Sequence, residues 1–370
     1  MTNARRLAKL PTPGQLTFSL MCGFSLLLIL RNSDTAIEYM GSGLRLCVKT
    51  VIPSLFPFMV ISELIVSSGL GELMGKVLDR PVRWLFGVSG ESAPAVILGA
   101  LCGFPLGARS AAALLDREAI SRREASRLLT FCNNPSSAFI INAVGITLYS
   151  SRSLGVTLYV VTLINAIIIG IAQRLFLRPL PRSASHHTPA KSPSGIEAFT
   201  ASVTHSALGM LNVCAYVVFF SAIVGCLSSM LSTLGISPFA SALIYGIVEL
   251  SGGVAATSAL GTDIVGVCLC AFIVGWSGLS VHFQIISSCA GRGISYRGYF
   301  IAKIVQGLMN SLVMFTLCRL FPSLLLPDGS KETWAILPSA FTLPYSSAVL
   351  ILFAASLSLA IPSIIPRKQK

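Results

Sequence analysis

Apolar segments long enough to cross a bilayer dominate this 370-residue chain, and polar residues separate them at short intervals. A transmembrane helix needs roughly 17 to 25 mostly apolar residues. The segments are 16–30, 45–66, 92–115, 124–149, 153–177, 206–232, 237–260, 263–288, 297–321 and 341–365. The pattern predicts an all-α, polytopic integral membrane protein. The lipid bilayer is therefore an expected partner.

Charge distribution excludes ten simple crossings. If every segment crossed, Arg117, Arg122, Arg123 and Arg127 would lie opposite the basic N-terminus, which carries Arg5, Arg6 and Lys9. Cytoplasmic loops are normally the basic ones. The conflict disappears if 92–115 enters from the cytoplasm, turns at GFPLG and leaves on the same side. Irregular backbone at that depth must be buried in protein or line a wet cavity.

A second re-entrant hairpin at 237–260, entering from outside, places the remaining basic loops inside. The order span, hairpin, broken span, span then occurs twice. Spacing supports the repeat: Pro105 to Glu249 is 249 − 105 = 144 residues, and Asn133 to Ser277 is 277 − 133 = 144 residues. We therefore expect an inverted repeat with two re-entrant helical hairpins and discontinuous helices, a layout that secondary transporters use around a central site.

The predicted organisation has five parts and eight spans, with both termini cytoplasmic. They are an N-terminal tail and first span (1–44), a first half (45–177), a Pro/Ser-rich cytoplasmic linker (178–205), a second, inverted half (206–321), and an external loop, last span and basic tail (322–370).

Composition narrows the function classes. Hydrophobic residues make up 54% and charged residues 11%, against about 25% charged in soluble domains. The net charge of +13 is explained by cytoplasmic loops, so no nucleic-acid partner is expected. The ten cysteines show no CxxC pair or metal-ligand spacing, and no catalytic motif occurs. We expect no enzyme activity, catalytic residue, metal or cofactor.

Four apolar stretches contain helix breakers beside polar groups: GFPLGAR, FCNNPSS, ELSGG and GWSGLSVHFQ. Asn134 is expected to cap a helix that restarts at Pro135 or Ser136. Helix N-termini after Pro105 and at Pro135 would favour an anion, which Arg109 would strengthen. Glu249 is expected to carry a proton or sodium ion, to accept hydrogen bonds from substrate, or to pair with Arg109.

The candidate substrate-binding residues are those of the four broken stretches. They are Gly103, Phe104, Pro105, Gly107, Arg109, Asn133, Asn134, Glu249, Ser251, Ser277, Gly278 and His282.

Three of these motifs carry a family resemblance: GFPLGARSAAALLDREAISRREASRLLTFCNNPSSAFIINAVG, GIVELSGG and GWSGLSVHFQ. Over about residues 45–321 the chain resembles the nucleoside-recognition, or Gate, domain family, and within it the sporulation integral membrane proteins of the YlbJ type. The resemblance implies a role in endospore formation, with movement of dipicolinic acid from mother cell toward forespore. It places the protein in the cell membrane or the outer forespore membrane.

Three functions stay open at this stage. The first is a secondary transporter of a small organic anion, dipicolinate, in which neutralising Arg109 abolishes uptake. The second is a transporter of a nucleoside or other neutral solute, and the third is a non-transporting scaffold for spore maturation. The coupling ion, proton or sodium, and the formation of a homo-oligomer are not determined by the sequence.

Overall fold

The computed structural model describes residues 13–67, 70–176, 195–261 and 263–325, and these residues are helical with short connections. The predicted last span at 341–365 and most of the predicted linker lie outside them. The elements up to the middle of the chain are α1 (Pro13–Arg31), α2 (Ser33–Leu46), η1 (Cys47–Val51), α3 (Ile52–Ser67), α4 (Leu70–Phe86), η2 (Gly90–Ser92), α5 (Ala93–Leu101), α6 (Leu106–Asp116), α7 (Arg122–Leu128), η3 (Ala138–Leu148) and α8 (Arg152–Phe176).

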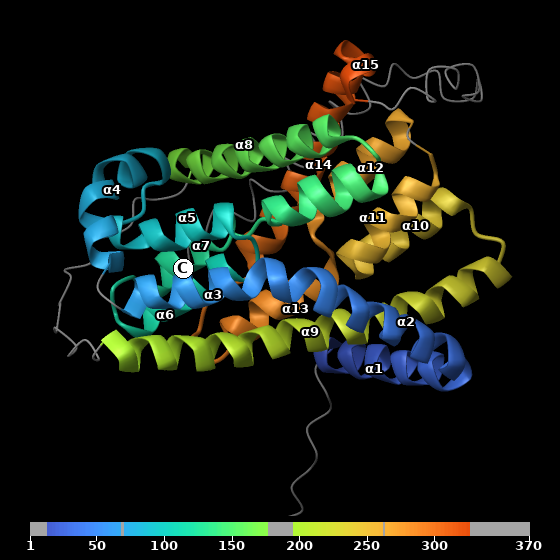
Figure 1. Cartoon of the computed structure of the whole chain (residues 1–370), viewed down its shortest axis with the longest axis horizontal. Coiled ribbons are helices and arrows are strands. Elements are labelled where there is room, and N and C mark those ends of the chain that lie inside the picture. Colours follow the sequence, from blue (N-terminus) through green and yellow to red (C-terminus); the bar gives the residue numbers. More distant parts are fainter. Residues whose placement is uncertain (1–12, 68–69, 177–194, 262, 326–370) are drawn as a thin grey trace, which may run out of the picture.

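The second part of the chain repeats this layout. Its elements are α9 (Gly195–Thr233), α10 (Pro238–Val248), α11 (Leu250–Ala259), α12 (Ile264–Trp276), α13 (Gly278–Ser288), α14 (Arg297–Leu320) and α15 (Pro322–Leu325). In both parts a pair of short helices precedes a broken helix, and a long helix follows. Figure 1 shows the pair α5 and α6 toward one end of the long axis and the pair α10 and α11 toward the other.

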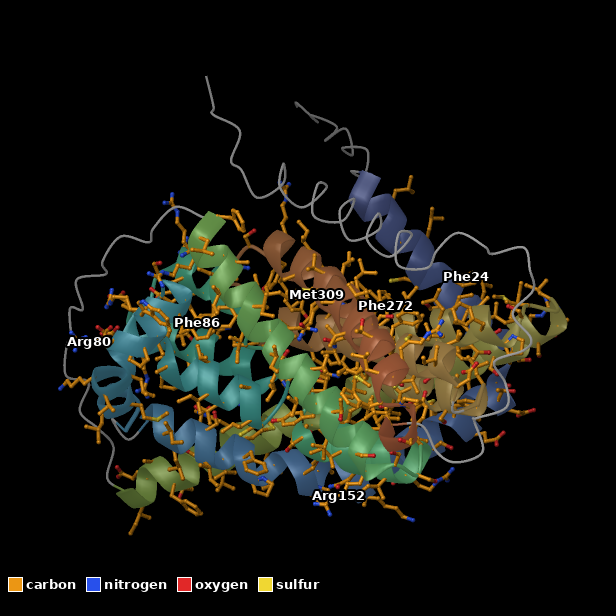
Figure 2. All side chains as sticks on the ribbon, turned by 90° about the horizontal axis from the view of Figure 1, so that it is seen from above. Phe24, Arg80, Phe86, Arg152, Phe272 and Met309 are labelled. Carbon is orange, nitrogen blue, oxygen red and sulfur yellow. The ribbon has the colours of Figure 1, made fainter. Side chains whose placement is uncertain are left out.

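Membrane-length helices are abundant, as the hydropathy predicts. Among the described residues, five helices are long and apolar enough to cross a membrane: Ser33–Ile65, Arg152–Phe176, Gly195–Thr233, Ile264–Ser288 and Arg297–Leu320. Large apolar side chains also face outward, including Phe24 on α1 (Figure 2). Extensive apolar surface of this kind is typical of contact with lipid, so the prediction of an all-α polytopic membrane protein is confirmed.

Some predicted boundaries differ from the structure. Helix α2 continues through η1 into α3, so the second apolar helix begins at Ser33, earlier than the predicted residue 45. Helix α9 already begins at Gly195, inside the predicted linker. In both places polar residues end the apolar segment of the hydropathy profile. The helix itself continues through these residues, because its backbone hydrogen bonds do not depend on apolar side chains.

Helices α5 and α6 fold back on each other. Residues 99 and 107 would lie about 12 Å apart along a continuous helix, yet a Cβ on Gly99 would meet the Cα of Gly107 at 2.9 Å. The chain turns at Gly103, whose φ is +89°, and the Phe104–Pro105 peptide is cis. The predicted helical arms and turn are therefore present.

The two ends of the α5–α6 hairpin lie on the same side of the molecule. Ser92, at its start, donates its hydroxyl to the carboxylate of Glu124 at 2.9 Å, just beyond its end. At the end of α6, the Asp116 carboxylate accepts two bonds from Arg292 of the second half, each 2.8 Å. The segment thus folds back toward its starting point. The bond to Asp116 also raises the pKa of the Arg292 guanidinium.

Helices α10 and α11 form a second hairpin with a break of one residue. Glu249 is extended, with φ −146° and ψ 130°. A Cβ on Gly253 would lie 2.1 Å from the Cα of Gly246, although seven residues of continuous helix span about 10 Å. The depth of both hairpins in a membrane stays a prediction.

Candidate functional site

Each hairpin tip contacts the helix break of its own half. In the first half, Phe104 donates its backbone N–H to the carbonyl of Asn134 at 2.8 Å. In the second half, a Cβ on Gly278 would meet the backbone nitrogen of Leu250 at 2.8 Å. The four broken stretches chosen from the sequence therefore form two pairs, one in each half.

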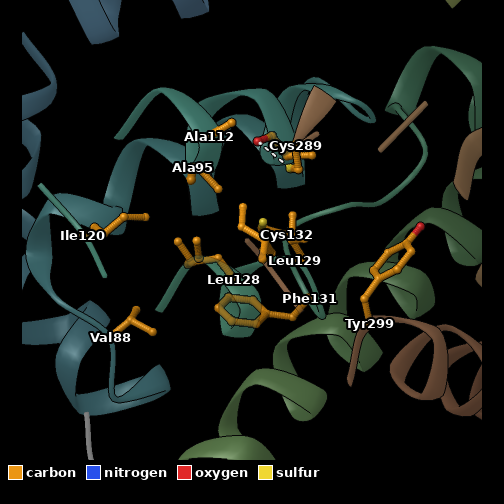
Figure 3. Packing of buried hydrophobic residues seen from close by; sticks show 14 of the residues in the cluster. Val88, Ala95, Ala112, Ile120, Leu128, Leu129, Phe131, Cys132, Cys289 and Tyr299 are labelled. Atoms are coloured by element: carbon orange, nitrogen blue, oxygen red, sulfur yellow. Dashed lines mark hydrogen bonds between the residues drawn. The ribbon is translucent and has the colours of Figure 1, made fainter. Parts of the chain in front are cut away.

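The first break is wrapped around the carbonyl of Cys132. A Cβ on Gly99 would approach this oxygen to 1.8 Å, and one on Gly107 to 2.0 Å, so only glycine fits at either position. Figure 3 shows Cys132 and Phe131 among buried side chains that include Cys289, which donates its thiol to the Ala108 carbonyl at 3.6 Å. Small residues thus let two helices approach the irregular backbone closely.

Asn133 and Asn134 are fully enclosed and hydrogen-bonded to protein. Asn133 accepts from the Ala108 N–H through its Oδ1 at 2.9 Å, which ties the break to α6. Asn134 donates to the Phe131 carbonyl and accepts from Gln306 at 2.7 Å. The prediction that Asn134 caps the restarted helix is wrong, because its side chain is used in these bonds; η3 begins at Ala138, and Ser136 Oγ accepts from the Phe139 N–H.

A buried polar network that sequence reasoning missed joins this break to α14 and α8. Gln306 Nε2 donates to Asn134 Oδ1 and to the Thr162 carbonyl, and Asn310 binds both Thr162 and Asn165. Lys303 donates to the Asn133 carbonyl and to Gln306. The spacing of residues 303, 306 and 310 places them on one face of a helix. That polar stripe in an otherwise apolar span was the signal available in the sequence.

The predicted partners Arg109 and Glu249 lie in different places. Arg109 Nη2 is 3.9 Å from the Glu63 carboxylate and donates to the His205 carbonyl at 3.2 Å. It packs directly on Gly209 of α9, where a Cβ would overlap its guanidinium. The expectation that Arg109 pairs with Glu249 is therefore wrong, because the first turn of α6 faces α3 and α9.

Glu249 caps its own helix. Its carboxylate accepts from the backbone N–H groups of Ser251 at 3.0 Å and Gly252 at 2.6 Å, at the N-terminus of α11. Only 4% of the residue is exposed. A carboxylate in this position neutralises the positive end of the helix.

Ser277, Gly278 and His282 belong to the packing around the second break. Ser277 has a left-handed backbone with φ +77° and returns its hydroxyl to the Val274 carbonyl. His282 Nδ1 lies 2.7 Å from the Tyr299 hydroxyl, and its ring meets Trp276 edge-on. These residues hold the break and the aromatic cluster together, while Gln284 is buried beside them.

A cavity of about 670 Å³ lies between the two halves. The N-terminal part and the first half together contribute α2, η1, the start of α3 and η3, and the second half contributes α9 and α11. Its polar lining residues are Tyr39, Ser42, Lys49, Thr50, Ser54, Asn142, Thr147, Ser221, Glu249 and Ser251. Of the twelve residues predicted to bind substrate, Glu249 and Ser251 line this cavity.

Two π-helical segments border the cavity. They are η1, which carries Lys49, and η3, which carries Asn142. Single π turns inside α-helices occur frequently at functional sites, because they redirect side chains that a regular helix would point elsewhere. Neither could be predicted from residue types, since π and α segments have the same apolar composition.

The lining can bind a small polar solute. Hydroxyl and amide groups supply donors and acceptors, Lys49 supplies a positive charge and Glu249 a carboxylate. Among the described residues, no group of three or more His, Cys, Asp or Glu side chains could hold a metal ion.

Comparisons with known proteins agree with the motifs. Residues 48–150 match the family model described as Gate, nucleoside recognition. The chain is 27% identical to the sporulation integral membrane protein YlbJ of Bacillus subtilis (strain 168), over 79% of this chain and 79% of that protein. No solved structure matches the chain. The resemblance predicted from the motifs is confirmed: residues 48–150 match the Gate model, and 79% of the chain is similar to a sporulation integral membrane protein.

Proposed function

We propose that this protein is a membrane transporter of a small organic solute that works during sporulation, and that the solute binds in the cavity between the two halves. The similarity to a sporulation integral membrane protein and to the Gate family supports this role. The proposal involves no covalent chemistry.

One observation carries the proposal. The cavity is lined by the beginnings of two elements that follow helix breaks, Ala138 and Phe139 of η3 and Ser251 and Gly252 of α11. They come from opposite halves of a repeated fold. A site shared by two repeats and bordered by discontinuous helices is the arrangement that many secondary transporters use for alternating access, because relative movement of the halves changes its exposure.

Dipicolinate is the substrate that we propose first. It is a planar pyridine dicarboxylate, small enough for a cavity of about 670 Å³. Lys49 offers a charge for one carboxylate, and the amide of Asn142 on η3 offers a donor for the other. The direction proposed is from the mother cell toward the forespore, across the outer forespore membrane.

A neutral solute such as a nucleoside is the second candidate, and Glu249 favours it. The Glu249 carboxylate already occupies the N–H groups at the start of α11, so that helix end is not free for an anion. Glu249 would instead accept bonds from hydroxyl groups of the solute.

Uptake by purified protein in proteoliposomes tests the proposal. Wild-type protein is expected to accumulate labelled dipicolinate above empty vesicles, and excess unlabelled dipicolinate to compete while nucleosides do not. Competition by nucleosides alone would select the second candidate. Glu249→Gln should reduce uptake, whereas the same substitution at exposed Glu38 on α2 serves as the matched control.

The absence of uptake of both solutes by correctly folded protein would contradict the transporter. It would favour a non-transporting scaffold, in which substitutions at the basic loops impair sporulation and Glu249→Gln does not.

A further inference from the structure

Lys303 lies in the middle of the buried network beneath the first break, and the proposed solute site does not use it. The residue is 0% exposed on α14. Its Nζ donates to the main-chain carbonyl of Asn133 and, at 2.9 Å, to Gln306 Oε1. The end of the side chain is therefore enclosed by protein, in the first third of the helix Arg297–Leu320, which is long enough to cross a membrane.

Within the described part of the chain, the hydrogen-bond partners of the Lys303 ammonium are neutral oxygens and not a carboxylate. Ion pairs occur elsewhere and include Arg83 with Asp79, Arg109 and His205 with Glu63, and Arg292 with Asp116. A buried charge is costly unless polar groups surround it, and here the surrounding groups are a carbonyl and an amide oxygen. The site is built to solvate a cation with neutral oxygens.

The titratable groups near Lys303 come from three elements. Cys132 belongs to the first break, His282 to α13, and Tyr299 to α14 itself. Cys289 follows α13 and faces Cys132. His282 is bound to the Tyr299 hydroxyl. None of these four neighbours is a carboxylate, and lysine is the group that carries the positive charge.

The position of Lys303 matches that of a coupling cation. Carbonyl groups at the C-terminal end of a helix and along unwound backbone attract cations, and in transporters with discontinuous helices such carbonyls bind Na⁺ or H⁺. The Asn133 carbonyl follows the end of α7 at Leu128, within the irregular stretch. The Lys303 ammonium donates to a carbonyl of this kind, in irregular backbone between α7 and η3.

We propose that Lys303 is the proton-binding site that couples solute movement to protons, and that its ammonium makes a sodium ion unnecessary. The inference rests on the proposed transport function and deepens it. Lysine is suited to the role because it gives up its proton in buried sites, which arginine does not.

The coupling step is a simple proton transfer. When the halves move apart and water reaches α14, an N–H bond of the ammonium breaks, its electron pair stays on nitrogen, and the proton passes to water. Neutral Lys303 then binds the Asn133 carbonyl more weakly, so the first break is released from α14. Protonation from the other side restores the contact.

Proton and solute movement measured in the same vesicles tests this step. In wild-type proteoliposomes that contain a pH-sensitive dye, dipicolinate flux should change the internal pH, and replacement of sodium by choline should alter the flux by less than about twofold, a free-energy difference of under 0.5 kcal/mol. Lys303→Arg should still fold, since it keeps the charge, but should lose proton movement at least tenfold (about 1.4 kcal/mol).

Arg319→Lys, at the exposed end of the same helix, is the control. Proton movement that persists in Lys303→Arg, or an absolute need for sodium in wild-type protein, would overturn the inference while leaving transport established. Absence of solute flux in wild-type protein would instead contradict the proposed function. If Lys303→Arg fails to fold, a measurement without transport completes the test. Wild-type protein in weakly buffered detergent should release protons to the solution or take them up when dipicolinate is added. The absence of any such exchange would overturn the coupling.

Discussion

The two helix breaks of the repeat are held in different ways. The first, at residues 132–137, is fixed from outside by Lys303 and Gln306 of the second half and by glycines of its own hairpin. The second, at Ser277, returns its hydroxyl to its own half, and the hairpin tip beside it leaves Glu249 and Ser251 at the cavity. The first break is thus braced by side chains of the other half, whereas the second half presents the carboxylate of its hairpin tip to the cavity.

Gly99→Ala should produce the largest effect, because the new Cβ would lie 1.8 Å from the Cys132 carbonyl. Backbone cannot move aside cheaply, so the cost should reach about 3 kcal/mol or more, the upper part of the overpacking range. We expect loss of monodisperse protein in fluorescence-detected size-exclusion chromatography. Gly23→Ala, where nothing lies within 4 Å, is the control, and normal folding of Gly99→Ala would refute the tight packing of the first break.

Gln306→Leu should destabilise the protein without touching the cavity. It leaves Asn134 Oδ1 and the Thr162 carbonyl without their donor, and each unsatisfied buried group costs about 1–3 kcal/mol. The melting temperature in detergent should fall by several degrees. An unchanged melting temperature would show that the network does not brace the first break.

Glu249→Gln should show most clearly the difference between a residue of the solute site and the residues that brace the first break. Glutamine keeps one of the two oxygens that accept from the N–H groups of Ser251 and Gly252, so the cap should weaken by about 1 kcal/mol. Uptake should fall at least about tenfold, which corresponds to 1.4 kcal/mol. A large loss of stability with normal residual uptake per folded molecule would contradict the assignment of Glu249 to the solute site.

Lys49→Gln should distinguish the substrates. Loss of its charge is expected to weaken competition by dipicolinate about three- to tenfold, a change of roughly 0.7–1.4 kcal/mol, and to leave nucleoside competition unaffected. Equal effects on both solutes would show that Lys49 does not bind a carboxylate.

Arg109→Gln should have the smallest effect, although the sequence suggested the largest. Arg109 contacts Glu63 at 3.9 Å, outside the cavity lining, and partly exposed ion pairs contribute about 0–1 kcal/mol. Uptake is expected to stay within about twofold of wild type. Abolished uptake by correctly folded protein would show that Arg109 contributes to solute transport.

The sequence predicted the hairpins and breaks better than it predicted the solute site. Glycine and proline within apolar segments restrict the backbone locally, so the turns at Gly103, Glu249 and Ser277 could be identified from residue types alone. The charge pattern predicts that the first hairpin returns to its starting side of the membrane. The bond between Ser92 and Glu124 agrees with a chain that folds back, and the re-entrant placement stays a prediction.

The directions of the side chains could not be predicted from local sequence patterns. Whether Arg109 faces Glu249 or Glu63 depends on how α6 is rotated against α3 and α9, a property of packing between distant segments. The contribution of Lys49 and Asn142 depends on π turns that composition does not reveal. The stripe formed by Lys303, Gln306 and Asn310 was visible, but its partners belong to the other half.

The central claim is that solute binds in the cavity between η3 and α11, and cysteine protection tests it most directly. In a Cys22→Ser background, which removes an exposed native thiol, Asn142→Cys should react with a polar maleimide, and saturating dipicolinate or the preferred nucleoside should slow the reaction at least about fivefold, roughly 1 kcal/mol. Ser232→Cys, on the exposed end of α9, should react at the same rate with and without solute. Equal protection at both positions, or none at residue 142 for any solute that the protein transports, would contradict the account.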